Sequence, residues 1–191
     1  MTRIGLLFEK IRSIANEHCE SQMYYWPGFD HLDPNPKKFF RKLGIEFDGN
    51  LFIRYQVKKT FSPMTVDKII EEESKIGVLL PTEYKALLAE FGGVHLPGNA
   101  NIAIDTPKVA LSATRDVWCY EGKPLSALAI SPFHRNADGN SIGFIRAGSE
   151  FSPIVHEFNH ELVYKGDDPS LWSRPLANTL SDFLLDYLDT K

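Results

Sequence analysis

The residues whose spacing most closely matches a catalytic motif lie at 156–160, where the chain reads His-Glu-Phe-Asn-His. This string fits the HExxH pattern of zinc metalloproteases, in which two histidines bind the metal and the glutamate acts as general base. That chemistry requires a helix, because helical spacing places both imidazoles on one face. Here Ser152-Pro153 and the β-branched pair Ile154-Val155 precede the string, which favours a strand. In a strand, His156 and His160 would lie about 13 Å apart, too far to share one zinc ion.

A turn at Asn159 would fold His160 back toward His156, yet a third zinc ligand would still be missing. Residues 162–164 are again strand-like and do not form a helix that carries another ligand. A zinc hydrolase that uses His156, Glu157 and His160 is therefore the remote alternative. We expect no metal site.

Other groups that could do chemistry are sparse. His134-Arg135 lies near Asp138 and forms either a polar pocket or an exposed loop. Cys19 and Cys119 are far apart and lack the CxxC-like spacing of a zinc site, so we expect two free thiols in a reducing compartment. The sequence contains no GxSxG elbow and no phosphate-binding P-loop. We therefore expect neither enzymatic activity nor a cofactor.

The composition is that of an ordinary globular protein. Of 191 residues, 43% are hydrophobic and 24% are charged, which is enough apolar material for one sizeable core. The formal net charge is −4, without the basic excess of a nucleic-acid binder, and mild acidity favours a basic partner. No secretory signal and no run of about 20 apolar residues is apparent, so we expect a soluble, cytoplasmic protein.

Two helices joined by a short apolar connector are the most definite local pattern. Thr65 is a suitable N-cap for a helix that buries Val66, Ile69 and Ile70, with the acidic run Glu71–Glu73 facing solvent. Gly77 ends this helix, and Pro81 begins the next one. The apolar stripe of the second helix consists of Tyr84, Leu87, Leu88 and Phe91, and Gly92-Gly93 ends it. Residues 77–81 are called the Leu-Pro elbow below.

The rest of the chain predicts an α+β fold with helices packed on one face of a largely antiparallel sheet. Strand-like runs lie at 51–57, 101–105, 125–130, 141–146, 154–158 and 162–164. Asp138-Gly139-Asn140 is a strong hairpin-turn candidate. Apolar residues from Leu176 to Leu188 predict a final helix, and the stripe over residues 4–15 predicts an initial one.

The ordered set of elements around the elbow resembles the SUKH superfamily, named after the Smi/Knr-type yeast cell-wall regulators. The resemblance begins with an acidic helix, then Gly77-Val78-Leu79-Leu80-Pro81 and the aromatic residue Tyr84. It continues with Asp138-Gly139 between two strands and with the strand and polar turn at 153–161. The family usually has Asn-Gly after the second helix, where this chain has Gly92-Gly93.

The resemblance covers residues 64–190 and implies a SUKH-like α+β domain there. Residues 1–60 match no family, and their pattern predicts an ordered N-terminal extension made of a helix and a turn-rich segment. The resemblance implies structural roles for Gly77, Leu80, Pro81, Tyr84, Asp138 and Gly139. Bacterial members of the family are mostly immunity proteins that bind and neutralise a cognate toxin, often a nuclease or deaminase. Eukaryotic members are regulatory or adaptor proteins. The expected partner is therefore a toxin, encoded by a neighbouring gene, and the adaptor function is the alternative.

Aromatic residues outside the helical stripes are the candidate anchors for such a partner, because Trp and Tyr are enriched at binding hot spots. The predicted partner-binding residues are Trp118, Tyr120, Phe133, His134, Arg135 and Trp172. The alternative for each aromatic residue is that it fills the edge of the core.

Overall fold

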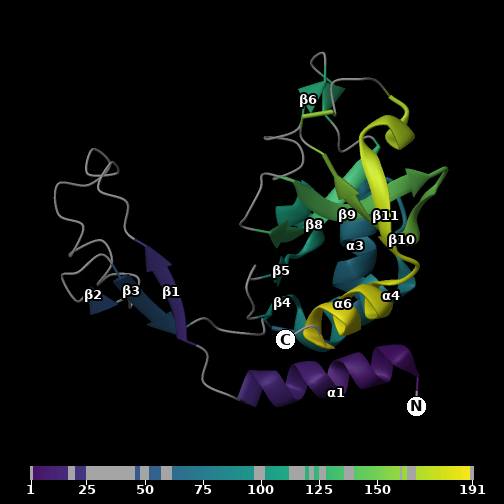
Figure 1. The fold of residues 1–191 in the computed structure, drawn as a ribbon. Helices are drawn as coiled ribbons and strands as arrows, with labels where there is room; N and C mark the ends of the chain where they lie inside the picture. The colour runs from purple at the N-terminus through teal and green to yellow at the C-terminus, as the bar shows by residue number, and fades with distance from the viewer. Residues whose placement is uncertain are drawn as a thin grey trace.

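The architecture is α+β in a computed structural model of the chain. The structure describes residues 2–16, 20–24, 46–47, 52–56, 62–96, 102–111, 119–120, 123–124, 128–135, 140–159, 161–162 and 167–189. An initial helix and a small sheet precede two consecutive helices. A six-stranded sheet and a final helix follow them (Figure 1).

The main sheet contains six strands in the spatial order β11-β10-β9-β8-β5-β4, and every neighbouring pair is antiparallel. Its strands are β4 Val94–Leu96, β5 Ile102–Ile104, β8 Ala129–Arg135, β9 Ser141–Ala147, β10 Glu150–Phe158 and β11 Ser173–Ala177. The antiparallel pairing of β8 with β9 agrees with a hairpin at the predicted turn. Asp138 and Gly139 themselves lie outside the described residues.

The two helices before this sheet begin and end at the capping residues that the sequence predicts. In α3 (Val66–Ile76), the Thr65 hydroxyl accepts a hydrogen bond from the Lys68 amide, and Gly77 ends the helix with a positive φ of 71°. In α4 (Thr82–Phe91), Pro81 is the N-cap and Gly92 is the left-handed C-cap. The helix therefore begins at Thr82, one residue after Pro81, which the sequence predicts as its first residue.

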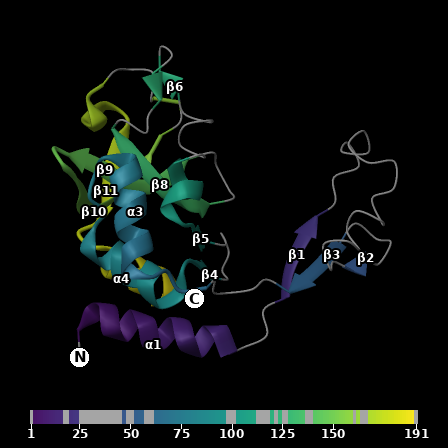
Figure 2. The same ribbon diagram turned by 180° about the vertical axis from the view of Figure 1, so that it is seen from behind.

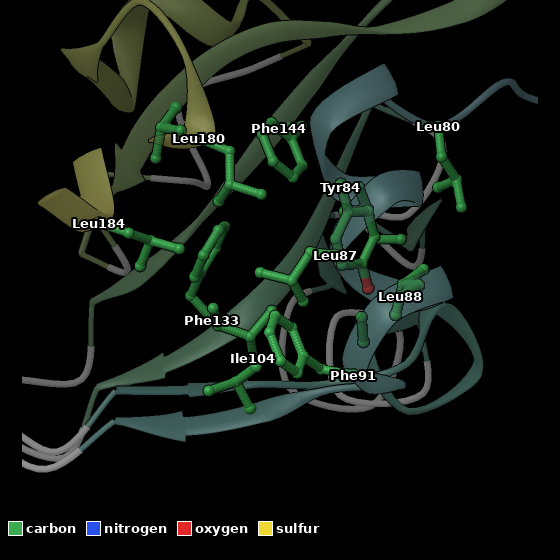
Figure 3. Close-up of a cluster of buried hydrophobic side chains, with 14 of the residues drawn as sticks. Leu80, Tyr84, Leu87, Leu88, Phe91, Ile104, Phe133, Phe144, Leu180 and Leu184 are labelled. Atoms are coloured by element: carbon green, nitrogen blue, oxygen red, sulfur yellow. The ribbon is translucent and has the colours of Figure 1, made fainter. Parts of the chain in front are cut away.

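One hydrophobic core joins these helices to one face of the main sheet. Tyr84 and Leu88 of α4 and Leu184 of α6 (Leu180–Asp189) are fully buried together with Phe133 of β8 and Phe144 of β9. Their side chains point toward one another in Figure 3. The rings of Phe133 and Phe144 meet edge to face at a centroid distance of 5.7 Å. The core thus holds α4 and α6 on the same face of the sheet.

The first helix, α1 (Arg3–Asn16), belongs to this core. Leu7 and Ile11 lie one turn apart on α1 and are fully buried within the same hydrophobic cluster as α4 and α6. The Phe8 ring packs edge to face on Phe91 of α4. Figures 1 and 2 both show α1 alongside α4 and α6. The predicted division between an extension at 1–60 and a domain at 64–190 therefore cuts through a shared core.

Ion pairs within the described residues also join α1 to α4 and α6. Arg3 contacts Asp182 of α6 at 2.5 Å, and Arg12 contacts Glu90 of α4 at 2.5 Å. Lys10 also pairs with Asp189, at the end of α6. These side chains are largely exposed, so each pair contributes little, and burial of Leu7 and Ile11 stabilises the docking of α1.

A separate three-stranded sheet follows α1 along the chain. Its strands are β1 (Glu20–Tyr24), β3 (Phe52–Gln56) and β2 (Glu46–Phe47), in this spatial order. Both pairings are antiparallel. The predicted strand at 51–57 is confirmed as β3. The short strands β6 (Cys119–Tyr120) and β7 (Lys123–Pro124) form a further antiparallel pair.

The opposite face of the main sheet carries a second, smaller hydrophobic cluster. Phe158 of β10 packs edge to face on Trp172, with ring centroids 5.5 Å apart, and Ala129 of β8 lies beside them. Ile145 of β9 also packs there, whereas Ile142 and Phe144 face the main core. This alternation is the period of two expected for a strand. The main sheet is thus apolar on both faces at this end.

Strand β11 is one edge of the main sheet, and its residue Pro175 lies opposite His156. The Asn159 amide donates to the Trp172 carbonyl at 2.8 Å, so this carbonyl, at the start of β11, faces β10. Because consecutive backbone groups alternate between the two sides of an antiparallel strand, the nitrogen of Pro175 faces away from β10.

Candidate functional site

The first three residues of the HExxH string lie in a strand, as predicted. His156, Glu157 and Phe158 are the last residues of β10 and pair with both β9 and β11. A strand directs His156 and Glu157 to opposite faces of the sheet. The helix that the metalloprotease arrangement requires is therefore absent at these three residues. His160 lies outside the described residues.

The Glu157 carboxylate is engaged in an ion pair. Its side chain is buried, and Oε2 accepts a hydrogen bond from Nε of Arg174 at 2.5 Å. Glu157 pairs with Ile142 of β9 and with Arg174 of β11 across the sheet, so all three residues share one face. A general base must lie within reach of a substrate proton. This carboxylate instead neutralises an arginine from the edge strand.

The His156 imidazole faces a hydroxyl group on the edge strand. Its Nδ1 lies 3.4 Å from Oγ of Ser173, and that hydroxyl donates to the carbonyl oxygen of Pro169 at 2.8 Å. Because the Ser173 proton points to a carbonyl, this pair does not have the arrangement of a base that activates a nucleophile. Partial burial lowers the pKa of His156 below its ordinary value of 6.5. The imidazole is therefore partly covered by the sheet, and its charged form is disfavoured.

A metal site would require at least one further ligand near these groups. Within the part of the chain that the structure describes, no group of three or more His, Cys, Asp or Glu side chains could hold a metal ion.

The helices in the same part are too short or too polar to cross a lipid bilayer.

The structure separates the residues predicted to bind a partner into two groups. Phe133 and Trp172 are each only 1% exposed, Phe133 in the main core and Trp172 in the second cluster. A buried ring offers no area to a partner, so the alternative that these two rings fill the core describes them better. Tyr120, His134 and Arg135 are described only by their backbones in β6 and β8, and Trp118 lies outside the described residues.

The Leu-Pro elbow is held by a buried carboxylate from the preceding helix. Oε1 of Glu73 accepts a hydrogen bond from the Leu80 amide at 2.7 Å and lies 3.1 Å from Nζ of Lys85. The side chains of Leu80 and Pro81 are buried. Glu73 thus satisfies a backbone donor that would otherwise be left unpaired at the start of α4.

Tyr84 anchors the other side of the elbow. Its hydroxyl donates to the carbonyl oxygen of Asp105 at 2.5 Å, and its ring is fully buried. Burial, followed by the nearby Asp105 charge, raises the pKa of Tyr84 well above its ordinary value. The phenol therefore stays protonated and remains a hydrogen-bond donor that links α4 to the residue after β5.

The elbow is also joined to the hairpin between β9 and β10. The Leu79 amide donates to the Ser149 carbonyl at 3.0 Å, and the Phe151 amide donates to the Leu79 carbonyl at 2.8 Å. These bonds form an isolated parallel bridge between Leu79 and Glu150. The Leu79 side chain itself remains 49% exposed.

Helix α3 presents apolar side chains to solvent and buries acidic ones, contrary to the prediction from sequence. Val66 is 67% exposed and Ile70 is 55% exposed, whereas Glu72 and Glu73 are buried. Only Ile69 of the three predicted core residues is buried. The sequence does contain a sign of this arrangement. Glu72 and Glu73 lie three and four residues after Ile69, which places them on the same face of the helix.

Comparison with known proteins provides no relative for this chain: no protein-family model, no curated protein and no solved structure matches it.

Proposed function

We propose that this chain is a non-enzymatic protein-binding domain that binds and neutralises a toxin encoded by a neighbouring gene. The toxin class, a nuclease or deaminase, follows from the resemblance to the SUKH superfamily. The residues that carry this resemblance have structural roles consistent with it. Gly77 caps α3, Leu80 and Pro81 are buried in the elbow, and Tyr84 is fully buried in the core.

The observation that supports protein binding most directly is the outward face of α3. Val66 and Ile70 are one turn apart, and the fold leaves both exposed while it buries two glutamates of the same helix. Burying an isoleucine or a valine stabilises a protein by about 1.5 to 3 kcal/mol, so a row of exposed ones is consistent with burial against a partner.

The groups that could do chemistry support a non-enzymatic role. The Glu157 carboxylate is bonded to Arg174, and the Ser173 hydroxyl donates to the Pro169 carbonyl. These interactions engage the carboxylate that would serve as a general base and the hydroxyl that would serve as a nucleophile. They hold the edge strand β11 and the 3₁₀ turn η4 (Pro169–Leu171) against β10.

Co-expression tests the proposal. The chain, tagged at one end, is produced together with the product of the adjacent gene, and the two are purified through the tag. We expect a stable complex and expect the growth defect caused by the neighbour alone to disappear. A neighbour that is neither toxic nor retained would remove the toxin assignment. A retained, non-toxic partner would instead indicate a regulatory adaptor.

Elemental analysis of the purified protein tests the remaining enzymatic alternative. We expect no stoichiometric zinc after purification without chelators. Zinc bound at one ion per chain and lost in His156→Ala would establish a metal site at the HExxH string and would overturn the non-enzymatic assignment.

A further inference from the structure

Val66 and Ile70 form an exposed apolar row on α3. Acidic residues border this row on one side, called its outer side. At about 100° per residue, Val66 and Ile70 differ by about 40° around the helix axis, and Asp67 and Glu71 each follow by about 100°. Asp67 and Glu71 are exposed like the row itself. On the inner side, the row borders Glu73, whose carboxylate is buried beneath the elbow. Exposed carboxylates therefore lie on the outer flank of the apolar row, whereas the Glu73 carboxylate is buried and bonded within the fold.

The lysines of the same helix lie on its opposite side. Lys68 and Lys75 are about 160° to 180° from the centre of the apolar row. Lys75 is already bonded to two carboxylates, Glu71 at 2.7 Å and Glu72 at 3.1 Å. The hydrogen bond from Lys75 lowers the pKa of Glu71, so this carboxyl stays ionised at neutral pH. The helix has four carboxylates against two lysines, so its own charged side chains carry a net negative charge.

An exposed apolar side chain also lies next to a carboxylate at the elbow. Leu79 exposes half of its side chain, and its bridge partner Glu150 is exposed beside it. The backbone of Leu79 is fixed by bonds to Ser149 and Phe151, so the side chain is presented from a rigid position. Because its backbone is already ordered, burying the Leu79 side chain in a complex would cost only side-chain entropy.

We propose that the outer face of α3, formed by Val66, Ile70, Asp67 and Glu71, binds a basic amphipathic segment of the partner protein. Apolar side chains of that segment cover Val66 and Ile70, while its lysine or arginine side chains face the flanking carboxylates. This complementarity steers association and sets the orientation of the complex. The inference rests on the proposed function, because it specifies the surface and chemistry through which that function operates.

The test uses the full chain and a defined probe. The probe is a fluorescein-labelled amphipathic peptide of about 14 residues, long enough to form a helix, made of leucine and lysine. Its counterpart carries glutamate in place of lysine. We expect the leucine–lysine peptide to raise the anisotropy saturably, with an affinity that falls as salt is added. The leucine–glutamate peptide should not bind.

Variants locate the binding surface. Val66→Ser combined with Ile70→Ser should weaken peptide binding at least about thirtyfold, the effect expected for loss of one hot-spot residue. Asp67→Lys combined with Glu71→Lys should weaken it as strongly. The matched control is Val109→Ser, which removes an exposed apolar side chain from the helical turn at 107–111. Equal affinity of the serine double variant and the wild type, or no binding to the wild type, would overturn the inference.

A second copy of the chain is the competing occupant of this face. Sedimentation equilibrium distinguishes the two, because a wild-type dimer that becomes a monomer in the Val66→Ser, Ile70→Ser variant would show that α3 pairs with itself. The neighbouring-gene experiment separates this inference from the proposed function. A toxin that is retained equally by wild type and double variant would leave the function standing and would refute α3 as its surface.

Discussion

Glu73 and Leu80 are bonded across the Leu-Pro elbow, with 2.7 Å between a buried carboxylate oxygen and a backbone nitrogen. The same carboxylate contacts Lys85, one turn into the second helix. A single side chain therefore connects the end of α3 to the start of α4. The acidic run at 71–73, which in sequence indicates a solvated surface, supplies the bond that sets the geometry of the elbow.

Replacing Glu73 with alanine should lower the free energy of unfolding by about 2 kcal/mol, because the Leu80 amide would be buried without a partner. Chemical denaturation followed by circular dichroism measures the change. Glu71→Ala is the matched control, since Glu71 is exposed and pairs with Lys75 of its own helix, so little change is expected. Equal effects of the two substitutions would contradict the role assigned to Glu73.

Gly143 occupies a position where β9 approaches β8 too closely for any side chain. A Cβ atom at Gly143 would lie 2.8 Å from the Cα atom of Ser131 and closer still to the carbonyl oxygen of Ile130. We expect Gly143→Ala to destabilise the protein by about 3 kcal/mol, measured by thermal or chemical unfolding.

Gly148 provides the control for Gly143, because its φ is +68° but a Cβ atom there would meet open space. Gly148→Ala therefore changes only the backbone preference, at a cost of about 1 to 2 kcal/mol. If Gly143→Ala proved as mild as Gly148→Ala, the close packing of β9 on β8 at this point would be wrong.

Because α1 packs into the main core, its buried face should contribute to the free energy of unfolding of the whole domain. Leu7→Ala should lower the free energy of unfolding by about 3 kcal/mol, because it leaves a cavity against α4 and α6. The neighbouring substitution Leu6→Ala, at a partly exposed side chain, should cost less than about 1 kcal/mol. Denaturation curves monitored by tryptophan fluorescence give both values. Identical midpoints for the two variants would mean that α1 is detached in solution.

Partial burial of His156 makes part of the stability dependent on pH. Because its folded pKa lies below the unfolded value of about 6.5, the unfolded chain takes up a proton that the folded chain does not. This stability is present above pH 6.5 and is lost as the pH falls through the folded pKa. Urea titrations at pH 7.5 to 5.5 (about one unit either side of 6.5) should show a smaller loss for His156→Gln than for wild type. Parallel curves would assign the pH dependence to other groups.

Capping residues made the helix boundaries around the elbow predictable from sequence. Thr65, Gly77 and Gly92 each have a local preference that is independent of the rest of the fold, and all three cap as predicted. The strands at 141–146 and 154–158 were predictable for the same kind of reason, since alternating β-branched and apolar residues favour extended backbone.

The orientation of α3 was not predictable by the same means, because it depends on partners distant in sequence. Burial of Glu73 is compensated by the Leu80 amide and by Lys85, which a helical pattern does not contain. Leu176 shows the same difficulty. It fits the apolar stripe of the final helix, but the chain places it in β11, and the helix begins only at Leu180.

Candidate partner-binding residues were the least predictable feature, because an aromatic side chain near a turn serves equally well in a core or in an interface. Phe133 and Trp172 proved to be core residues, each packed against another aromatic ring. The surface proposed instead contains Val66 and Ile70, whose exposure becomes apparent only when the buried acids of α3 are located. The strand context of the HExxH string was predictable from Pro153 and the β-branched residues that follow it.

Pro175 limits strand addition at one edge of the main sheet. Its nitrogen faces outward from the edge strand and has no hydrogen to donate, so a neighbouring chain that tried to extend the sheet there would meet a gap in the hydrogen-bonding ladder. Pro175 thereby disfavours strand addition at the β11 edge and the fibril formation to which such addition leads. A contact made at this edge would depend on side-chain complementarity, which discriminates between sequences as backbone pairing does not.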